Sequence, residues 1–355
     1  GEQGAALGVG QYSPASRVRV RVFAVGAEGL PEDAAGVAAL VRRRLERAVA
    51  LRRALGYEEA ARLVFGESDG LPGLVVDRFG AVLVVQLLSA GMEALRAEVV
   101  AALRELLAPA AIVERSDTGG REREGLAPAR GLLAGALPED GEAPFRAGGL
   151  ALAADVLGGQ KTGFYLDQRD SWLALRPFGA GRRILDACCY TGAFGLSLLL
   201  GGGASLLGVD SSKRAVARAA VLAERNGLAA KARFEAADAG ERLAALARAG
   251  ERFDFVILDP SAFARARAHR GLAEKAYAAL NEAALAVVAP DGLLFTCSCT
   301  PWVGAEELGR AVAGAARRQG RGAVLLETRG QSRDHPVHPL MPETRYLTGE
   351  LWHVA

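Results

Sequence analysis

The stretch from Ile184 to Asp210, ILDACCYTGAFGLSLLLGGGASLLGVD, restricts the possible folds more than any other part of the chain. A short apolar strand ends at Asp186, a turn of small residues follows, and a helix begins near Ala193. Glycines 201–203 end that helix before a second apolar strand, which ends at Asp210. This pattern predicts a strand–helix–strand unit of a doubly wound α/β sheet. In such a sheet the turn lies at the ligand-binding edge, and the second acid lies near ribose hydroxyls.

Two other interpretations of this stretch are weaker. Residues 187–209 carry no charge and are long enough to cross a bilayer, but the glycines break any continuous helix and acids bracket the run. The dinucleotide fingerprint G-x-G-x-x-G is absent, and only Gly192 and Gly195 lie where its glycines would be. S-adenosylmethionine has no pyrophosphate and needs no such set, so it fits better than a nicotinamide or flavin. On this stretch alone, a strand–helix–strand unit that binds no ligand is an equally good interpretation.

Length and composition indicate a globular protein of two domains, one of them large. The chain has 355 residues, of which 50% are hydrophobic and 24% charged, and its net charge of +2 does not discriminate for or against nucleic acid. No signal peptide or credible membrane span is recognised, which favours the cytoplasm. The four cysteines fall as Cys188–Cys189 and Cys297-x-Cys299, a spacing that suits free thiols rather than a zinc site.

The first third of the chain is rich in arginine. Alternating valine and arginine predict an amphipathic strand with a basic outer face, formed by Arg17, Arg19 and Arg21. A helix follows, with a solvated polar face favoured over a nucleic-acid surface. Its apolar face is predicted to carry Val37, Val41, Leu45, Ala48, Leu51 and Leu55, and its other face Arg42, Arg43, Arg44 and Arg47.

From Arg62 onward, the sequence pattern is typical of β-strands. The segments RLVFGES, GLVVDRF, AVLVVQLL and AIVERS, with a helix near Glu93 to Leu107, predict a small α+β domain. A hairpin with its turn at Gly148–Gly149 leads to the loop GQKTGFYLDQRD, residues 159–170. From Ser171 onward helices and strands alternate, including a helix over residues 271–288, as a parallel sheet with crossover helices requires.

Acids and a thiol recur at the ends of the predicted parallel strands. Because all such ends lie along one edge of a doubly wound sheet, these side chains favour a functional site over solvated loop charge. The acids are Asp186, Asp210, Asp238 and Asp259, and Cys299 follows the next strand.

The segment TCSCTP contains the predicted nucleophile. Neighbouring strands lie about 4.8 Å apart, so Cys299 is expected to reach the same substrate group as Asp259 and Pro260. A thiolate there suits covalent catalysis. Cys297 lies inside the strand, where the role of a small buried hydrophobe is favoured.

Several motifs occur together in a fixed order: GQKTGFYLDQRD, DACCYTGAF, VDSS, LDP-x-x-F, a strand ending in SC, and a tail DHPV…PETRYL. Together they resemble the bacterial 23S ribosomal RNA cytosine-C5 methyltransferases that carry an N-terminal PUA domain, over roughly residues 8 to 355. Where the family usually reads Asp-Pro-Pro, this chain has Ser261 after Pro260, and Ala278 follows Tyr277 where a lysine is frequent.

The resemblance implies both the fold and the domain organisation. It predicts a class I Rossmann-like methyltransferase domain over residues 157–355, preceded by a central α+β domain over residues 24–156. Residues 1–23 are predicted to be the C-terminal remnant of a PUA-like RNA-binding domain, whose closing strand is YSPASRVRVRV and most of which is missing.

The resemblance also implies the chemistry, with S-adenosylmethionine as donor and a cytidine of large-subunit RNA as target. Cys299 is expected to add to cytosine C6, since the alternative nucleophile position of cytosine-C5 enzymes is Ser261 here. Asp259 is expected to hydrogen-bond the base edge. The predicted cofactor-binding residues are Asp186, Tyr190, Gly192, Asp210, Ser211, Asp238, Lys161 and Arg169, and the predicted substrate-binding residues are Pro260, Phe263 and His335.

Some of these roles carry more detail. Asp210 is placed on the ribose and Asp238 near the adenine amine, while Lys161 and Arg169 either pair with the donor's methionyl carboxylate or are plain loop charges. His335 and His338 lack further ligand spacing, so no metal is predicted.

The sequence therefore predicts a cytoplasmic, RNA-binding transferase of rRNA processing that forms 5-methylcytosine. Its expected partner is 23S ribosomal RNA, free or in a subunit precursor, without membrane or metal, and a homodimer stays open. The alternatives are methylation of a base nitrogen, which needs no cysteine, and a catalytically weak RNA-binding or assembly protein that keeps the fold.

Overall fold

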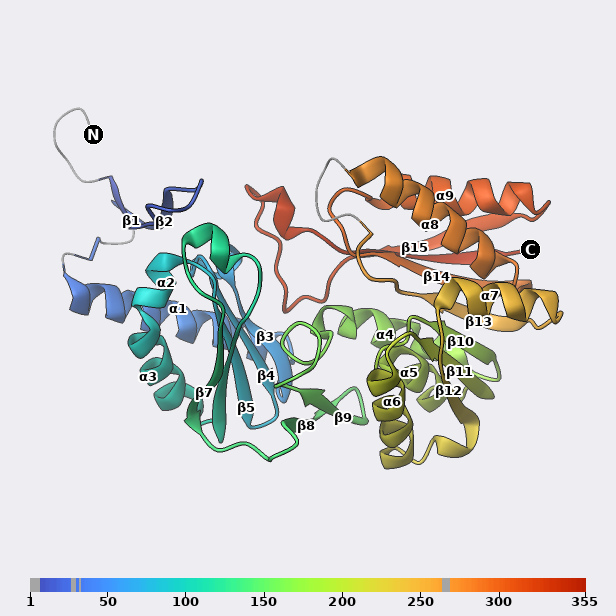
Figure 1. Cartoon of the computed structure of the whole chain (residues 1–355), viewed down its shortest axis with the longest axis horizontal. Helices are drawn as coiled ribbons and strands as arrows, with labels where there is room; N and C mark the ends of the chain where they lie inside the picture. Colours follow the sequence, from blue (N-terminus) through green and yellow to red (C-terminus); the bar gives the residue numbers. More distant parts are fainter. Residues whose placement is uncertain (1–6, 27–29, 32, 264–268) are drawn as a thin grey trace. The chain divides into compact units, whose positions relative to one another are not determined.

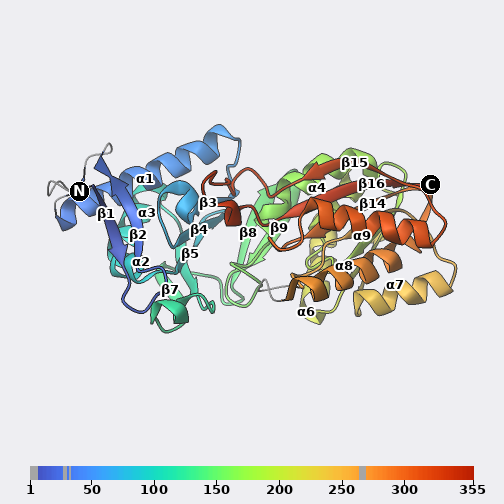
Figure 2. The same cartoon turned by 90° about the horizontal axis from the view of Figure 1, so that it is seen from above.

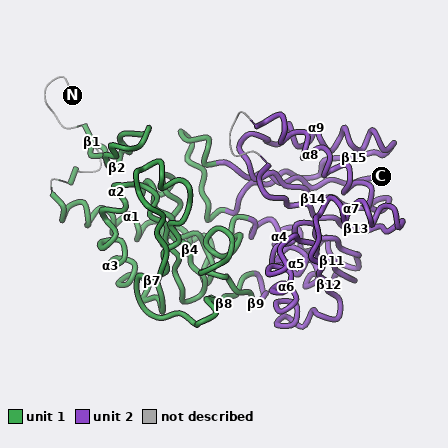
Figure 3. The backbone as a smooth tube through the Cα atoms, in the orientation of Figure 1, with its two compact units in different colours: residues 1–147, 152–167, 333–344 green, residues 148–151, 168–332, 345–355 purple. Residues whose placement is uncertain are grey.

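The computed structural model describes residues 7–26, 30–31, 33–263 and 269–355 (Figure 1). The chain divides into two compact units (Figure 3). Unit 1 comprises Gly1–Ala147, Leu152–Asp167 and Arg333–Thr344, and unit 2 comprises Gly148–Ala151, Gln168–Ser332 and Arg345–Ala355. The finer division at residues 23 and 156 stays a prediction.

Unit 1 is built on a five-stranded sheet with the order β3-β4-β5-β6-β7. All neighbours are antiparallel except β5 and β6, which are parallel and connected through α2 and α3. Helices α1 and α3 pack against each other beside this sheet (Figure 2). The elements are α1 (Ala34–Ala54), β3 (Ala60–Phe65), β4 (Leu74–Phe79), β5 (Val82–Leu87), α2 (Ala90–Ala94), α3 (Arg96–Leu107), β6 (Ala111–Ser116) and β7 (Ala129–Gly135).

The expected α+β character of this region is present, with two differences in detail. The single helix expected from Glu93 to Leu107 is two helices, because the chain leaves helical geometry at Leu95, with φ −99° and ψ 17°. Strand β7 was not expected from the sequence. Its glycines and its partly exposed residues disrupt the alternation of apolar and polar side chains that predicts a strand.

Helix α1 begins at an Asp33 cap, whose carboxylate accepts a hydrogen bond from Gly36 N at 2.7 Å. Leu51, expected on the apolar face, is 42% exposed, and that prediction is wrong. Arg52 is buried instead, because its guanidinium forms two hydrogen bonds to the carboxylate of Asp69. A paired arginine therefore replaces a leucine on the buried face of this helix.

The N-terminal strand is present, but its valines are exposed and Arg21 points inward, the reverse of the predicted orientation. Strand β2 (Val20–Val25) pairs antiparallel with β1 (Gly8–Tyr12), and Val20 and Val22 are exposed. Arg21, expected on a basic outer face, points inward and donates to Glu124 at 2.8 Å. The cause is Phe23, which is buried and shares the face of Arg21 because side chains alternate along a strand.

A short hairpin follows unit 1's sheet in sequence. It consists of β8 (Glu142–Ala147) and β9 (Leu150–Asp155), and its turn lies at Gly148 and Gly149 as predicted. Both glycines have positive φ angles, 54° and 80°, which other residues rarely adopt.

Unit 2 is a seven-stranded sheet with the order β12-β11-β10-β13-β14-β16-β15 and helices on both faces (Figure 1). The strands from β12 to β14 are mutually parallel, and β16 is antiparallel to both of its neighbours. The strands are β10 (Arg183–Ala187), β11 (Ser205–Asp210), β12 (Ala232–Ala236), β13 (Phe253–Leu258), β14 (Val288–Ser298), β15 (Ala323–Arg329) and β16 (Thr348–Val354).

The crossover helices follow the predicted alternation, and the predicted α/β fold class is confirmed. They are α5 (Ala193–Leu200), α6 (Lys213–Arg225), α7 (Ala239–Arg248), α8 (Arg270–Leu285) and α9 (Ala305–Arg318), and a further helix, α4 (Arg169–Leu175), precedes β10. Helix α8 is shorter than expected, because Val288 already pairs with Phe253 as the first residue of β14. Among the described residues, none of the helices combines the length and the apolar character that crossing a membrane requires.

Candidate active site

Three of the four predicted acids meet at the carboxyl edge of the central strands of unit 2. Strand β10 lies between β11 and β13, and Ala187 is paired with Val209 on one side and Leu258 on the other. Asp186 therefore lies beside the ends of both neighbouring strands, where Asp210 ends β11 and Asp259 directly follows β13. This is the position at which doubly wound sheets bind ligands.

The loop between β10 and α5 is tightly held over this edge. Cys188 and Tyr190 have φ angles of 66° and 48°, a left-handed geometry that costs about 1–2 kcal/mol for each non-glycine residue. Hydrogen bonds maintain it, since Cys189 N donates to Val209 O at 2.9 Å and Tyr190 N donates to Asp210 Oδ2 at 2.8 Å. Gly192 also has a positive φ of 79°.

Asp210 and Asp186 both accept backbone hydrogen bonds from this loop region. Asp210 Oδ1 accepts from Ser212 N at 2.9 Å, so its two oxygens connect the ends of two loops. Asp186 Oδ2 accepts from Gly195 N at 2.9 Å, in the first turn of α5. Burial, with smaller contributions from Asp259 and Asp210, raises the pKa of Asp186 to about 8.

The remaining predicted cofactor residues of this edge are more open. Asp238 lies two residues beyond β12, is exposed, and caps α7 by accepting from Glu241 N at 2.9 Å. Ser211 is exposed beside Asp210. The Thr191 hydroxyl is buried and has no hydrogen-bond partner among the described residues. Carboxylates, a hydroxyl and a helix N-terminus thus surround one strand edge, and this donor and acceptor set fits a nucleoside-bearing cofactor.

Cys297 lies inside β14 and Cys299 lies just beyond its end, as their positions in the sequence predict. Cys297 lies within the strand with an exposure of 0%, and its sulfur accepts a hydrogen bond from Gln168 Nε2 at 3.3 Å. Cys299 follows the strand, is half-buried, and its Sγ donates to Pro260 O at 3.4 Å. Since β13 and β14 are paired up to Leu258 and Thr296, the thiol of Cys299 lies beside the Asp259–Pro260 loop.

The other three cysteines are poor nucleophiles. Burial raises the pKa of the thiols of Cys188, Cys189 and Cys297, and nearby carboxylates, Asp259 or Asp186 first among them, raise it further. A thiol whose pKa is raised stays protonated near neutral pH, and the thiolate is the reactive form.

An aromatic pair lies next to this loop. Phe263, one of the predicted substrate-binding residues, is 41% exposed, and its ring packs edge-on against Tyr277 with centroids 4.8 Å apart. Pro260 is buried. Tyr277 on α8 is fully buried, and burial, followed by the nearby Cys299, raises the pKa of its hydroxyl. No local sequence signal assigns Tyr277 or Gln168 to this site, because their contacts with Phe263 and Cys297 join separate segments of the chain.

Three predicted residues are divided between the units. Arg169 is the first residue of α4 in unit 2, whereas Lys161 and His335 belong to unit 1. Lys161 Nζ lies 2.6 Å from Asp167 Oδ2 and 4.4 Å from the centroid of the Tyr165 ring. The roles expected for these residues stay predictions.

His335 takes part in a buried ion cluster of unit 1. Its Nδ1 lies 2.8 Å from Asp334 Oδ1, and Asp334 Oδ2 accepts from Arg62 N at 2.8 Å. Arg62 also forms two hydrogen bonds of 2.8 Å to Asp77. Across the described residues, no group of three or more His, Cys, Asp or Glu side chains is arranged to hold a metal ion.

Comparisons with known proteins agree with this geometry. Residues 179–318 match a family described as "Methyltransferase domain". The chain is 39% identical to ribosomal RNA large subunit methyltransferase I from Klebsiella pneumoniae (strain 342), over 98% of this chain and 86% of that protein. It is 40% identical to the protein of the same name from Serratia proteamaculans (strain 568), over 98% and 87% of the two chains.

Solved structures share the fold. A protein assigned as a methyltransferase and crystallised with SAH superposes with a TM-score of 0.82 at 20% identity, covering 98% of this chain and 88% of that one. The tRNA m1G37 methyltransferase of M. jannaschii gives 0.56 at 13% identity, over 88% and 78% of the two chains. The expected methyltransferase fold and S-adenosylmethionine as the cofactor are thereby confirmed.

Proposed function

The chain belongs to the family of ribosomal RNA large subunit methyltransferase I, and from this premise we propose that it methylates C5 of a cytosine in large-subunit ribosomal RNA. The donor is S-adenosylmethionine, and Cys299 is the nucleophile. The substrate is 23S RNA, free or in a subunit precursor, and the work is done in the cytoplasm. The product is 5-methylcytosine.

One observation carries the choice of C5: the half-buried Cys299 thiol beside the Asp259–Pro260 loop. Methylation of a base nitrogen needs no thiol at this position, because the nitrogen lone pair attacks the methyl group directly. Cytosine C5 is a poor nucleophile and needs covalent activation at C6. Cys297, the other cysteine of this segment, is fully buried inside β14, whereas Cys299 is half-buried beside the loop.

The proposed reaction begins when the Cys299 thiolate adds to cytosine C6, which turns C5 into an enamine carbon. Asp259 hydrogen-bonds the base edge and favours the protonated ring nitrogen, so that the electron pair from the C5–C6 bond is accepted by the ring. S-adenosylmethionine would supply the methyl group: as C5 bonds to the methyl carbon, the bond between that carbon and the donor's sulfonium breaks, and S-adenosylhomocysteine leaves. A base removes the C5 proton, the C6–S bond breaks, and the thiolate of Cys299 and the aromatic ring are restored.

The same proposal assigns the remaining residues of the edge. Asp210 binds the ribose hydroxyls and Asp238 the adenine amine, while Tyr190, Gly192 and Ser211 line the donor. Asp186 is proposed to position the donor site, because its carboxylate accepts a hydrogen bond from Gly195 N and so holds the first turn of α5. Lys161 and Arg169 are proposed for the methionyl carboxylate of the donor, and Pro260, Phe263 and His335 for the RNA.

The experiment uses large-subunit RNA that carries 5-fluorocytidine at the target. Fluorine at C5 cannot leave as a proton does, so the enzyme is expected to stay bound to RNA through C6 after methyl transfer. A denaturing gel should show a donor-dependent shifted band for the wild type and for the matched control Cys297→Ala. Cys299→Ala and Cys299→Ser should give no band, because a serine hydroxyl has almost no anionic fraction near neutral pH.

Nucleoside mass spectrometry of the unmodified RNA is the second readout. Wild-type enzyme should produce 5-methylcytidine, and Cys299→Ala should produce none. Normal methylation by Cys299→Ala, or a methyl group found on a base nitrogen, would refute the C5 assignment and favour nitrogen methylation.

A further inference from the structure

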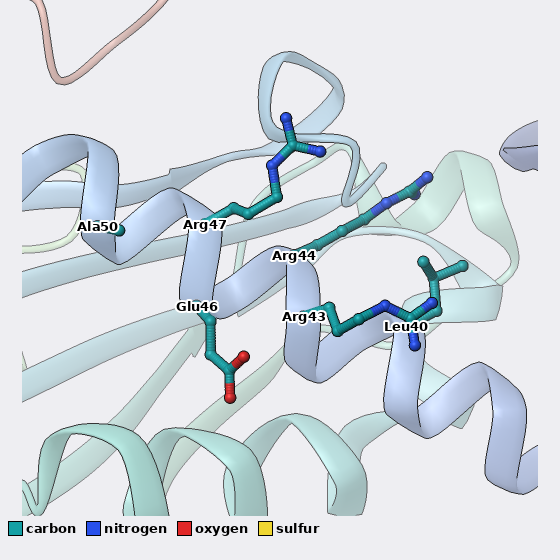
Figure 4. Close-up of a pocket in the computed structure, with 6 residues that line it drawn as sticks. All are labelled: Leu40, Arg43, Arg44, Glu46, Arg47 and Ala50. Carbon is teal, nitrogen blue, oxygen red and sulfur yellow. The ribbon is translucent and has the colours of Figure 1, made fainter. Parts of the chain in front are cut away.

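The outer surface of α1 carries a basic hollow that the methyl-transfer chemistry does not use. Its volume is about 590 Å³, within the range of sites that bind small ligands, and its lining includes Arg43, Arg44 and Arg47 (Figure 4). The hollow lies in unit 1, whereas the cysteines and the acids of the strand edge lie in unit 2.

The charge of this hollow is strongly positive. Glu46 is the acid of the lining, but it points away from Arg44 and Arg47 (Figure 4), and it pairs with Arg42 Nε at 3.2 Å. Arg43 and Arg47 are exposed and form no ion pair within the described parts of the chain. Their guanidinium groups are therefore available to an anion from outside.

Arg44 is held in place beside them. Its Nη1 donates to Gly70 O, and its Cζ lies 5.1 Å from the centroid of the Phe23 ring. A guanidinium fixed in this way loses little freedom when it binds an anion. The lining thus combines the fixed Arg44 with the exposed Arg43 and Arg47, all on α1.

We propose that this hollow binds the phosphate backbone of the large-subunit RNA substrate, with Arg43 and Arg47 as the phosphate contacts. Side chains at positions i and i+4 of a helix have Cβ atoms about 5–6 Å apart, so both arginines can contact one stretch of backbone. Planar guanidinium groups match phosphate oxygens in pairs. An acidic protein partner is the competing occupant, but the proposed RNA substrate supplies a polyanion of the required chemistry.

This inference rests on the proposed function, because it takes large-subunit RNA as the substrate. The test measures the affinity of the full chain for a large-subunit RNA fragment between about 50 and 200 mM KCl. Arg43→Gln with Arg47→Gln removes two phosphate contacts. The log–log salt slope should become shallower by about 1.4 for single strands or 1.8 for duplex, and the affinity at the lowest salt should fall about tenfold or more.

The matched control removes two positive charges elsewhere, with Arg53→Gln on α1 and Arg317→Gln on α9. Both arginines are exposed, lie outside the hollow and form no ion pair among the described residues. The control should leave the salt slope close to that of the wild type. Donor affinity, measured by calorimetry, should be the same in all three proteins.

Equal slopes for the Arg43/Arg47 variant and the wild type would refute the hollow as an RNA site. So would equal losses in that variant and the control, because the effect would then be one of net charge alone. A wild type that binds the RNA but never forms 5-methylcytidine would refute the proposed function and leave the binding site standing.

Discussion

Buried acids are compensated differently in the two units. In unit 1, Asp77 is buried, which alone would raise its pKa, but the Arg62 guanidinium lowers the pKa below its ordinary value. In unit 2, Asp186 is equally buried, forms no ion pair within the described residues, and its pKa is raised to about 8. Asp77 is thus paired with a cation, whereas Asp186 accepts a hydrogen bond from a backbone N–H and its raised pKa favours the neutral form.

The difference separates structural acids from those at the ligand edge. A buried ion pair whose hydrogen bonds are satisfied holds segments together, as Arg62 and Asp77 hold β3 to β4. Neighbouring carboxylates without cations are costly, and they concentrate where a ligand or a reaction uses them. The contrast between Asp77 and Asp186 therefore supports the proposed ligand edge by an argument that uses no sequence motif.

Breaking the ion pair of unit 1 should have the largest effect. Arg62→Ala leaves Asp77 buried without its cation, and removing one partner of a buried pair costs about 3–5 kcal/mol. Hydrogen exchange followed by mass spectrometry of peptides covering β3 and β4 should show the loss of protection. Because the three tryptophans, Trp172, Trp302 and Trp352, lie in unit 2, their fluorescence reports the other unit separately.

The control for that variant replaces both partners. Arg62→Met combined with Asp77→Leu leaves no buried charge from this pair, so most of the protection should return. If Arg62→Ala alone kept the wild-type protection, the pair would not be structural and the contrast between the units would be wrong.

The second effect concerns donor binding at the edge of unit 2. Asp210→Ala removes charge-assisted hydrogen bonds worth about 1.5–3 kcal/mol, so the affinity for S-adenosylmethionine should fall about ten- to a hundredfold. Asp254→Ala is the matched control, because Asp254 accepts from Arg183 N at 2.8 Å at the opposite edge of the same sheet. Calorimetry that gave equal affinities for both variants would remove Asp210 from the donor site.

Over a single pH unit, the smallest effect is the pH dependence that Asp186 imposes on unit 2. Its folded-state pKa of about 8 exceeds the ordinary value of 3.8, so its stabilising contribution is complete below pH 3.8 and is lost as pH rises through 8. Between these values the free energy of unfolding should fall by at most about 1.4 kcal/mol per pH unit. Asp186→Asn keeps an acceptor for Gly195 N and should abolish this slope in urea unfolding followed by tryptophan fluorescence. A slope equal to that of the wild type would assign the dependence to another group.

The strand edge is predictable from the sequence because its signals are local. A strand and a run of glycines can each be read within a few residues, and the placement of Cys297 inside the strand and Cys299 at its end follows from where the apolar run of β14 stops. The acids of β10, β11 and β13 were found by the same local pattern.

Pairings between distant residues were not predictable in this way. Arg52 is buried through its hydrogen bonds to Asp69, Arg21 donates to Glu124, 103 residues away, and Cys297 accepts from Gln168, 129 residues away. No local pattern marks such partners. The sequence therefore assigned arginines to solvated faces by default, and it missed both those that are buried and the hollow on α1.

The path of the chain has a consequence for how this protein can change over generations. Residues 333–344 belong to unit 1 although both flanking segments belong to unit 2, and Asp334 accepts hydrogen bonds there from Arg62 N through its carboxylate. Its backbone oxygen accepts from Arg52 Nη2 at 2.8 Å. A gene fragment that ends before Arg333 would leave both donors buried without these acceptors. Recombination at a single point therefore does not exchange either unit as a whole, and the two units are expected to be inherited together.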